Sequence, residues 1–336
     1  MPEAVATRPR DSRALAPPRA AALASVGIAL PPRAVSNEIT AARLGVSEEW
    51  IVERTGVRER RVSEESEDVV DLAVEACAGA AANAGIDPSE LDLVLAATMS
   101  YDRLTPNLAP AVAARLGAER AGALDVGAAC SGFIGALALA TAQVESGRAR
   151  SVMVVGADQM SRLIDPLDRS TAALFGDGAG AVVVIEAGDG TGWIGPVVLG
   201  QDGARGELVR AERAEAILRM EGQDTFREAV RRLSEATFEV LALSELEPEA
   251  IDAFIFHQAN ARILATVGQR LGIDERRVVN TISRFGNTSA ASVPIALADS
   301  LESGLLRPGG RALLAAFGGG LTWGAATIEW GAADVA

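Results

Sequence analysis

The chain has 336 residues, 49% of them hydrophobic and only 4% aromatic, which predicts a globular protein with a large core of small aliphatic side chains. Its formal net charge of −14 opposes non-specific binding to nucleic acid, so no nucleic-acid partner is expected. All 31 basic residues are arginine, and the absence of lysine excludes Schiff-base chemistry, a pyridoxal phosphate anchor and the lysine-containing phosphate-binding loop.

The N-terminal segment, residues 1–21, is rich in Pro, Arg and Ala and lacks the continuous apolar stretch of a secretory signal. We expect it to be a disordered, solvated tail. The longest apolar runs elsewhere have about ten residues, which is shorter than the ~20 that a bilayer span requires. These features predict a cytoplasmic protein with no membrane partner.

Two stretches, residues 69–98 and 226–258, follow the same order of elements and indicate an internal duplication. Each has apolar residues at helical spacing, then a turn with proline, then an apolar run expected to be a buried strand. Aligning Asp92 with Asp252 gives an offset of 160 (252 − 92), which also brings "VMVVGA" at 152 onto "ALLAAF" at 312. A third pair, "GAGAVVVIEAG" and "TWGAATIEWGA", matches after a shorter spacing. We therefore predict an α/β fold with two duplicated halves, residues 22–190 and 191–336.

Residues 123–147 begin as a short strand and become helical after Cys130, where Ser131 and Gly132 open a long Ala- and Leu-rich run. Cys130 is therefore expected at or near a buried helix N-terminus, where the helix dipole favours thiolate over thiol. This position favours a nucleophile, whereas Cys77, within an Ala-rich helix, fits an inert buried cysteine. Two cysteines and one histidine are too few for a disulfide framework or a Cys- and His-based metal site, so no metal is predicted.

His257 is the single histidine and ends an apolar run in "IFHQANARIL" (255–264), a place where histidine more often serves packing than chemistry. Asn287 lies in a Gly-Asn-Thr-Ser turn that opens a predicted helix, where a helix cap is the alternative role. Three glycines follow the apolar strand in "LLAAFGGGLTWG" and allow backbone N–H groups to approach a ligand closely. A nucleotide-binding loop is disfavoured there, because a strand rather than a helix follows the glycines.

Six motifs in the chain closely resemble the β-ketoacyl-acyl-carrier-protein synthase III family, which initiates fatty acid and some polyketide chains. They are "EEWIVERTGVRERR", "DVGAACSGF", "DPLDRSTAALFGDGAGA", "HQANARIL", "RFGNTSAASVP" and "AFGGGLTWG". The resemblance runs from about Ala22 to Trp330. It implies the thiolase fold, in which two duplicated α/β halves form five layers, and it implies a homodimer.

The resemblance also implies roles for individual residues. Cys130 matches the acyl-accepting nucleophile, and His257 and Asn287 match the pair that promotes decarboxylation. The backbone N–H groups of Cys130 and Gly319 match the oxyanion hole. The other matches are Trp50 and Arg162 on either side of the adenine of coenzyme A, Arg54 and Asn260 along its channel, Phe317 and Thr105 at the acyl pocket, and Arg227, Arg262 and Arg270, with Arg231 and Arg232 nearby, at the carrier-protein docking site.

The implied reaction is a decarboxylative Claisen condensation of an acyl-CoA primer with malonyl-acyl-carrier protein through an acyl-cysteine, which gives 3-ketoacyl-carrier protein and CO₂. No cofactor is expected beyond the coenzyme A thioester itself. Thr105 stands where family members that prefer acetyl primers hold a phenylalanine that closes the acyl pocket across the dimer, so a longer primer is expected. The alternatives are a starter-unit acyltransferase or priming ketosynthase of a polyketide pathway, and a non-catalytic partner subunit, against which Cys130 argues.

Overall fold

The computed structural model describes residues 19–331. Residues 1–18 of the predicted tail lie outside this range, so the expectation of disorder there stays a prediction. The first strand, β1, begins at Ala21 and therefore includes the last residue of the segment predicted as a tail.

The first half of the chain forms a five-stranded sheet in the order β1-β7-β6-β4-β5. The strand β4 is parallel to both of its neighbours, whereas β7 is antiparallel to β6 and β1. The elements of this half are β1 (Ala21–Ala29), α3 (Val69–Ala84), β4 (Leu93–Ala97), α4 (Leu108–Leu116), β5 (Gly122–Asp125), α5 (Gly132–Glu145), β6 (Ser151–Gln159) and β7 (Asp177–Glu186).

The second half repeats this order in a four-stranded sheet, β8-β13-β12-β11. Its β11 is parallel to β12, and β13 is antiparallel to β12 and β8, as in the first sheet. The offset of 160 holds for the start of β11 against β4 (253 − 93) and of α9 against α5 (292 − 132). The predicted duplication is therefore present. The elements of this half are β8 (Gly192–Gln201), α6 (Gly222–Leu243), β11 (Ala253–Phe256), α7 (Ala261–Leu271), α8 (Ile282–Phe285), α9 (Ser292–Glu302), β12 (Arg311–Gly318) and β13 (Thr322–Trp330).

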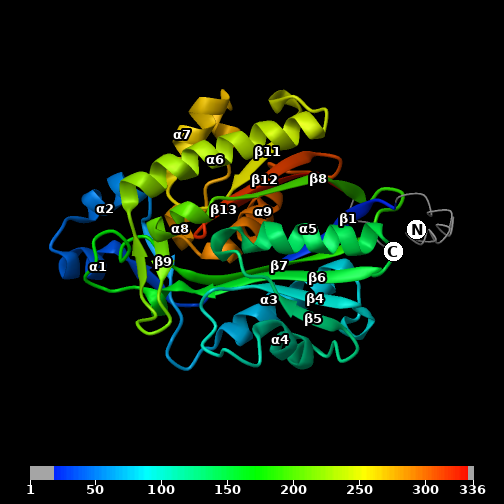
Figure 1. Ribbon diagram of the computed structural model, residues 1–336, viewed down its shortest axis with the longest axis horizontal. Helices are drawn as coiled ribbons and strands as arrows, with labels where there is room; N and C mark the ends of the chain where they lie inside the picture. The colour runs from blue at the N-terminus through cyan, green and yellow to red at the C-terminus, as the bar shows by residue number, and fades with distance from the viewer. Residues whose placement is uncertain (1–18, 332–336) are drawn as a thin grey trace, which may run out of the picture.

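Figure 1 shows the five layers that result from packing the two halves face to face. The helices α5 and α9 lie between the sheets, and α5 contacts strands of both of them. The helices α3 and α4 cover the outer face of the first sheet, and α6 and α7 cover that of the second. Ala, Val, Leu and Ile dominate the clusters between these layers, so the aliphatic core predicted from composition is observed.

Two small additions lie at one end of the layers. One joins a ribbon of β2 (Ala34–Ser36) and β3 (Glu59–Arg61) to the helices α1 (Asn37–Leu44) and α2 (Glu48–Thr55), and the other is a ribbon of β9 (Val209–Ala211) and β10 (Leu218–Met220). The side chain of Ser47 caps α2 by accepting a hydrogen bond from the Trp50 N–H at 3.1 Å. Gly56 ends α2 at φ 79°, where an added Cβ would lie 2.2 Å from the Cβ of Ala261. This glycine lets the end of α2 pack closely against the start of α7.

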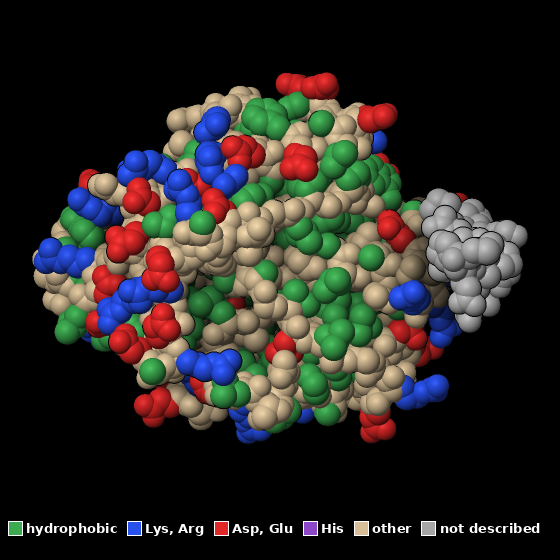
Figure 2. Space-filling model, viewed as in Figure 1, with side chains coloured by type: hydrophobic (Ala, Val, Ile, Leu, Met, Phe, Trp, Pro, Cys, Tyr) green, Lys and Arg blue, Asp and Glu red, His purple; other side chains and the backbone are tan. Residues whose placement is uncertain are grey.

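One face of the molecule exposes large apolar side chains. Leu124 in β5, Leu139 in α5 and Leu199 in β8 are 59%, 48% and 58% exposed. Figure 2 shows green apolar side chains across the face where Figure 1 places these elements. Strand β5 is also an edge strand with β4 as its one hydrogen-bonded neighbour in the sheet. Across residues 19–331, no helix combines the length and the apolar character needed to cross a bilayer.

Candidate active site

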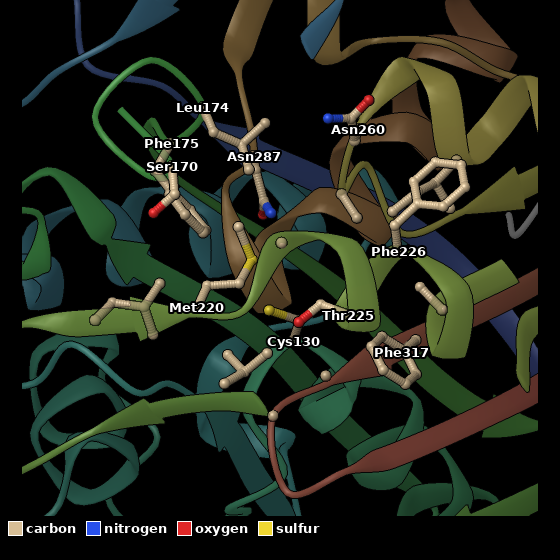
Figure 3. A pocket seen from close by; sticks show the side chains of 18 of the residues that line it. Cys130, Ser170, Leu174, Phe175, Met220, Thr225, Phe226, Asn260, Asn287 and Phe317 are labelled. Carbon is tan, nitrogen blue, oxygen red and sulfur yellow. The ribbon is translucent and has the colours of Figure 1, made fainter. Parts of the chain in front are cut away.

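A cavity of about 800 Å³ lies where the two halves meet. Cys130 enters it just before α5, His257 just after β11 and Asn287 just before the turn that leads into α9. Figure 3 shows the Cys130 and Asn287 side chains at this cavity with those of Met220, Thr225 and Phe317. Three segments that are far apart in the sequence therefore bring a thiol, an imidazole and an amide to one enclosure.

Cys130 lies on a tight turn between β5 and α5, in a short 3₁₀ segment, Ala129–Ser131. The hydroxyl of Ser131 donates to the Ala128 carbonyl at 2.9 Å and lies 2.8 Å from the hydroxyl of Thr322, which ties this turn to the start of β13. Gly318 passes so close that an added Cβ would lie 2.8 Å from the Cys130 nitrogen. The small residues of "CSG" and "FGGG" thus allow the two backbones to meet at Cys130.

The thiol of Cys130 does not have the depressed pKa expected from its helix N-terminus. Desolvation of the thiolate, with a smaller contribution from the buried Asp158 carboxylate, raises the pKa of Cys130 to about 11. A hydrogen bond from the Ser289 hydroxyl to the sulfur, at 3.5 Å, opposes this shift without reversing it. At this helix start the loss of water therefore outweighs the dipole that favours the thiolate.

Asp158 is fully buried behind Cys130, and its carboxylate accepts hydrogen bonds from several backbone N–H groups. It accepts hydrogen bonds from the N–H groups of Met99 at 2.8 Å, Ser100 at 3.2 Å and Ala290 at 3.2 Å. Burial raises the pKa of Asp158, and these donors act in the opposite direction. The carboxylate thereby joins the end of β4 to the segment that follows Asn287.

His257 is almost completely buried, and its backbone N–H donates to the Ala315 carbonyl of β12 at 2.7 Å. Its Nδ1 lies 2.6 Å from the hydroxyl oxygen of Ser292, the first residue of α9. Burial lowers the pKa of His257 to about 3, so the imidazole is neutral at physiological pH. With Nδ1 occupied, Nε2 is the ring nitrogen that remains for a ligand in the cavity.

Asn287 is held from both sides by backbone hydrogen bonds. Its N–H donates to the Leu174 carbonyl at 2.9 Å, and its carbonyl accepts from the Gly176 N–H at 3.1 Å. Its side-chain Oδ1 accepts a hydrogen bond from the N–H of Ser289 at 2.9 Å. This bond determines the orientation of the side-chain amide, because only the oxygen can accept. The amide nitrogen, Nδ2, is therefore the end that can donate to a ligand, while Oδ1 binds the first N–H of the 3₁₀ turn Ser289–Ala291.

Most of the other residues singled out from the sequence line the same cavity. They are Trp50, Arg54, Asn260, Phe317, Gly319, Arg227 and Arg262. The guanidinium of Arg54 stacks on the Trp50 ring at 4.3 Å, and Asn260 binds the Arg54 carbonyl at 3.0 Å while capping α7. The contact between α2 and α7 thus places these three residues together.

Three predicted site residues, Arg162, Thr105 and Arg270, do not line the cavity. Arg162 instead binds the carboxylate of Asp102 at 3.4 Å and the carbonyl of Glu67, so its predicted place beside an adenine is not supported. Arg169, seven residues later in the same "DPLDRST" motif, lines the cavity and is anchored on the Leu44 carbonyl at 2.9 Å. Thr105 is exposed in the loop between β4 and α4, away from the cavity of its own chain.

Sequence analysis also missed the apolar walls of the cavity. Met99, Met160, Phe175, Leu218 and Met220 line it from four separate segments. The local sequence pattern does not distinguish these side chains from ordinary core residues. Strand and turn positions are apolar whether they line a cavity or pack in the core.

Comparisons with known proteins agree with this fold. Residues 124–203 match the family described as 3-oxoacyl-[acyl-carrier-protein] synthase III. Residues 241–330 match the family described as the C-terminal part of the same enzyme. The β-ketoacyl-[acyl-carrier-protein] synthase III 3 of Streptomyces coelicolor is 43% identical over 331 residues, which are 94% of this chain and 99% of the relative.

Two solved structures are similar over nearly the whole chain. The 3-oxoacyl-(acyl carrier protein) synthase III of Pseudomonas aeruginosa gives a TM-score of 0.89 at 42% identity and covers 94% of this chain and 99% of that one. The priming β-ketosynthase of the R1128 polyketide biosynthetic pathway gives a TM-score of 0.89 at 40% identity and covers 94% and 97%.

The duplicated halves and the central cysteine define an acyltransferase of the thiolase fold. Within that class, the chain belongs to the 3-oxoacyl-[acyl-carrier-protein] synthase III family.

The raised pKa of the Cys130 thiol predicts slow, strongly pH-dependent alkylation. Between pH 7 and pH 9.5 the rate of modification by iodoacetamide should rise about tenfold per pH unit, because thiolate is the reactive form. Mass spectrometry of the modified peptide measures this rate, and Cys130→Ala supplies the background from Cys77. A rate that levels off below pH 9 would contradict the account.

Proposed function

We propose that this chain condenses an acyl-CoA primer with malonyl-acyl-carrier protein and so starts a fatty acid or polyketide chain. The observation that carries the proposal is the meeting of a cysteine thiol with two oriented neutral donors, His257 and Asn287, in one buried cavity. Family membership supplies the reaction class. Groups of the chain and of its substrates can supply every proton and electron pair that the reaction transfers. We therefore propose that no cofactor beyond the CoA thioester takes part.

In the first half-reaction, the sulfur of Cys130 attacks the acyl-CoA carbonyl. A bond forms between carbon and the cysteine sulfur, the bond to the CoA sulfur breaks, and the thiol proton passes to the departing CoA. The backbone N–H groups of Cys130 and Gly319 are proposed to stabilise the tetrahedral oxyanion. Attack is coupled to this proton transfer because the resting thiol is protonated.

In the second half-reaction, malonyl-carrier protein replaces CoA and loses CO₂. The electrons of the broken carbon–carbon bond enter the thioester as an enolate, whose oxygen we propose accepts hydrogen bonds from His257 Nε2 and Asn287 Nδ2. The enolate carbon then attacks the acyl-cysteine, the cysteine sulfur leaves, and a proton from solvent restores the thiol. A neutral imidazole suits this step, since it donates a hydrogen bond without requiring a proton transfer.

The proposed CoA channel runs from Cys130 to the mouth of the cavity at α2. Trp50 and Arg169 offer a flat ring and a planar guanidinium there, both suited to contact with an adenine. Arg169 replaces the residue predicted from sequence, Arg162. Arg54 and Asn260 line the same path toward the cavity interior.

We propose that the carrier protein docks on α7 and the first part of α6. Figure 2 shows arginines gathered where Figure 1 places these helices. Arg262 lies over the Phe226 ring at 5.6 Å, and among the described residues no carboxylate pairs with Arg262 or Arg270. Arg227 also lines the mouth, with Asp224 at 2.6 Å from its guanidinium. These arginines supply a local positive surface on a chain of net charge −14.

Arg231 and Arg232, predicted to lie near the docking site, are engaged within the chain. Arg231 binds Glu228 at 3.0 Å, and Arg232 binds Asp202 at 3.1 Å and Glu235 at 3.1 Å. We therefore assign docking to Arg227, Arg262 and Arg270 only.

We propose that two copies of the chain form a homodimer through the face that contains β5. This face has an edge strand and exposed leucines that a second copy can cover. Thr105 lies in the loop between β4 and α4 and is exposed, so it can contribute to the acyl pocket of a second copy rather than to its own. A threonine there leaves room for a primer longer than acetyl. The chain's free thiols and the absence of a membrane-crossing helix among the described residues fit our proposal that it works in the cytoplasm.

The similarity to the R1128 priming β-ketosynthase favours a second candidate, a priming enzyme of a polyketide pathway. It would use the same acylation and decarboxylation chemistry on a different carrier protein. Kinetics with fatty acid and polyketide carrier proteins side by side separate the two candidates.

Removal of each of the three groups should separate the half-reactions. Cys130→Ala should form no acyl-enzyme, whereas His257→Ala and Asn287→Ala should acylate but lose malonyl decarboxylation by about 10²- to 10³-fold, the usual loss for one oxyanion donor. Intact-mass analysis measures acylation, and CO₂ release measures decarboxylation. Cys77→Ala is the matched control and should retain both. Decarboxylation at the parent rate by either donor variant would refute the assignment.

Arg262→Glu should raise the KM for malonyl-carrier protein about 5- to 10-fold at low salt and less at high salt, because docking is electrostatic. Its rate of acylation by acyl-CoA should change little. Arg148→Glu, an exposed charge reversal in the turn after α5, is the control. Equal losses in both half-reactions would show that docking is not what Arg262 provides.

The primer preference is tested by Thr105→Phe. In the parent protein the rate of acylation should rise from acetyl-CoA toward longer acyl-CoA thioesters, and the added ring should reverse that order by filling the pocket of the partner subunit. Thr105→Ser, which adds no bulk, should keep the parent order. The idea fails if the parent protein prefers acetyl-CoA to every longer thioester.

A further inference from the structure

Ser292 lies outside the set of residues assigned to the reaction, yet it makes the side-chain hydrogen bond of the His257 ring. It is 1% exposed and begins α9, and its Oγ is 2.6 Å from His257 Nδ1. The same oxygen accepts the backbone N–H of Gln258 at 3.3 Å. Two groups, His257 Nδ1 and the Gln258 N–H, therefore share one buried hydroxyl.

The Gln258 N–H is a fixed donor in this arrangement. The Gln258 side chain donates to the carbonyls of Phe256 at 2.7 Å and Val279 at 3.2 Å, and it accepts from the N–H of Thr281 at 2.8 Å. The residue is fully buried. Because its side-chain amide is held by these bonds, Gln258 keeps its backbone N–H directed at the Ser292 oxygen.

Counting protons then decides between the two neutral forms of His257. If Nδ1 carried the proton, both lone pairs of the Ser292 oxygen would receive donors, and its own hydrogen would have no acceptor among the described residues. If the hydroxyl donates to Nδ1 instead, the Ser292 hydrogen, His257 Nδ1 and the Gln258 N–H all have partners. Buried polar groups strongly favour the satisfied arrangement.

We infer that Ser292 is a positioning residue that fixes His257 as the Nε2–H tautomer and so aims the imidazole proton into the cavity. This inference rests on the proposed function for its catalytic consequence. Without the hydroxyl, the ring is free to place its proton on Nδ1 and to present a bare Nε2, which repels an enolate oxygen.

The same segment orients the second donor. The Ser289 N–H holds Oδ1 of Asn287 at 2.9 Å and leaves Nδ2 to donate, while Ser292, three residues later, holds Nδ1 of His257 and leaves Nε2 to donate. One turn of chain, residues 287–292, therefore sets the direction of both donors proposed for the enolate. Neither Ser289 nor Ser292 needs to touch substrate to do so.

The single histidine makes the tautomer directly measurable. Full-length protein labelled with ¹⁵N-histidine and purified without a histidine tag holds one imidazole, whose two nitrogen resonances show which nitrogen bears the proton. The wild-type protein at pH 7 should show a protonated Nε2 and an unprotonated Nδ1. The opposite assignment in the wild-type protein would overturn the inference, whatever any variant does.

Ser292→Ala should populate the Nδ1–H form and lower malonyl decarboxylation about 10- to 100-fold, the usual loss when a hydrogen bond that orients a histidine is removed, with acylation of Cys130 within about threefold of the parent. Ser292→Thr keeps the hydroxyl and should retain the wild-type tautomer. Ser300→Ala is the matched control, since Ser300 is a buried serine of α9 whose hydroxyl binds the Leu297 carbonyl at 2.7 Å.

An unchanged tautomer together with parent decarboxylation in Ser292→Ala would refute the positioning role. If Ser292→Ala does not fold, the wild-type spectrum and Ser292→Thr still decide the matter, because loss of the Nε2–H form in the threonine variant would count against the hydroxyl. If the wild-type protein fails to decarboxylate malonyl-carrier protein, the proposed function fails. The tautomer result stands apart from that outcome.

Discussion

The chemistry of this protein depends on how closely the backbone at the starts of α5 and α9 approaches the strands behind it. An added Cβ on Gly156 of β6 would lie 2.4 Å from the Ala290 carbonyl, and one on Gly318 would lie 2.8 Å from the Cys130 nitrogen. Only glycine permits both approaches. These contacts hold the first turns of the two central helices against β6 and the end of β12, and they place Cys130 and the segment that follows Asn287.

Duplication explains why the two helix starts meet. Each half begins a buried helix, α5 or α9, at the same relative position, and packing the halves face to face brings these positions together in the central layer. The halves then diverged in what they carry. The first supplies Cys130 at the start of α5, whereas the corresponding position 160 residues later is Ala290, which donates its N–H to Asp158. The duplicated elements form the cavity, and residues that differ between the two halves supply the different proposed roles.

Burial determines the protonation states of Cys130 and His257 inside the cavity. It raises the pKa of Cys130 and lowers that of His257, so both groups are neutral at physiological pH. In a site with little water, hydrogen bonds from neutral donors to a developing enolate are strong and need no reorganisation. The protein therefore favours a transition state that carries negative charge over the neutral thioester from which it forms, which is the requirement for decarboxylation.

Much of this could be predicted from the sequence, and the failures have physical causes. The offset of 160 revealed the duplication, and the turns around Cys130, His257 and Asn287 marked the residues that the cavity brings together. The choice between Arg162 and Arg169 depends on the path of a loop, which no local pattern encodes. The pKa of Cys130 depends on how much water the whole fold removes, a property of tertiary packing that a helix N-terminus cannot reveal by itself.

The central claim is that His257 and Asn287 jointly bind the oxygen on which charge develops. It is tested most directly by a crystal structure with a malonyl-carrier analogue whose thioester is replaced by an unreactive amide. The account predicts the amide oxygen within about 2.7–3.1 Å of both His257 Nε2 and Asn287 Nδ2. An ordered malonyl group whose carbonyl oxygen lies beyond hydrogen-bond distance of both nitrogens would contradict it.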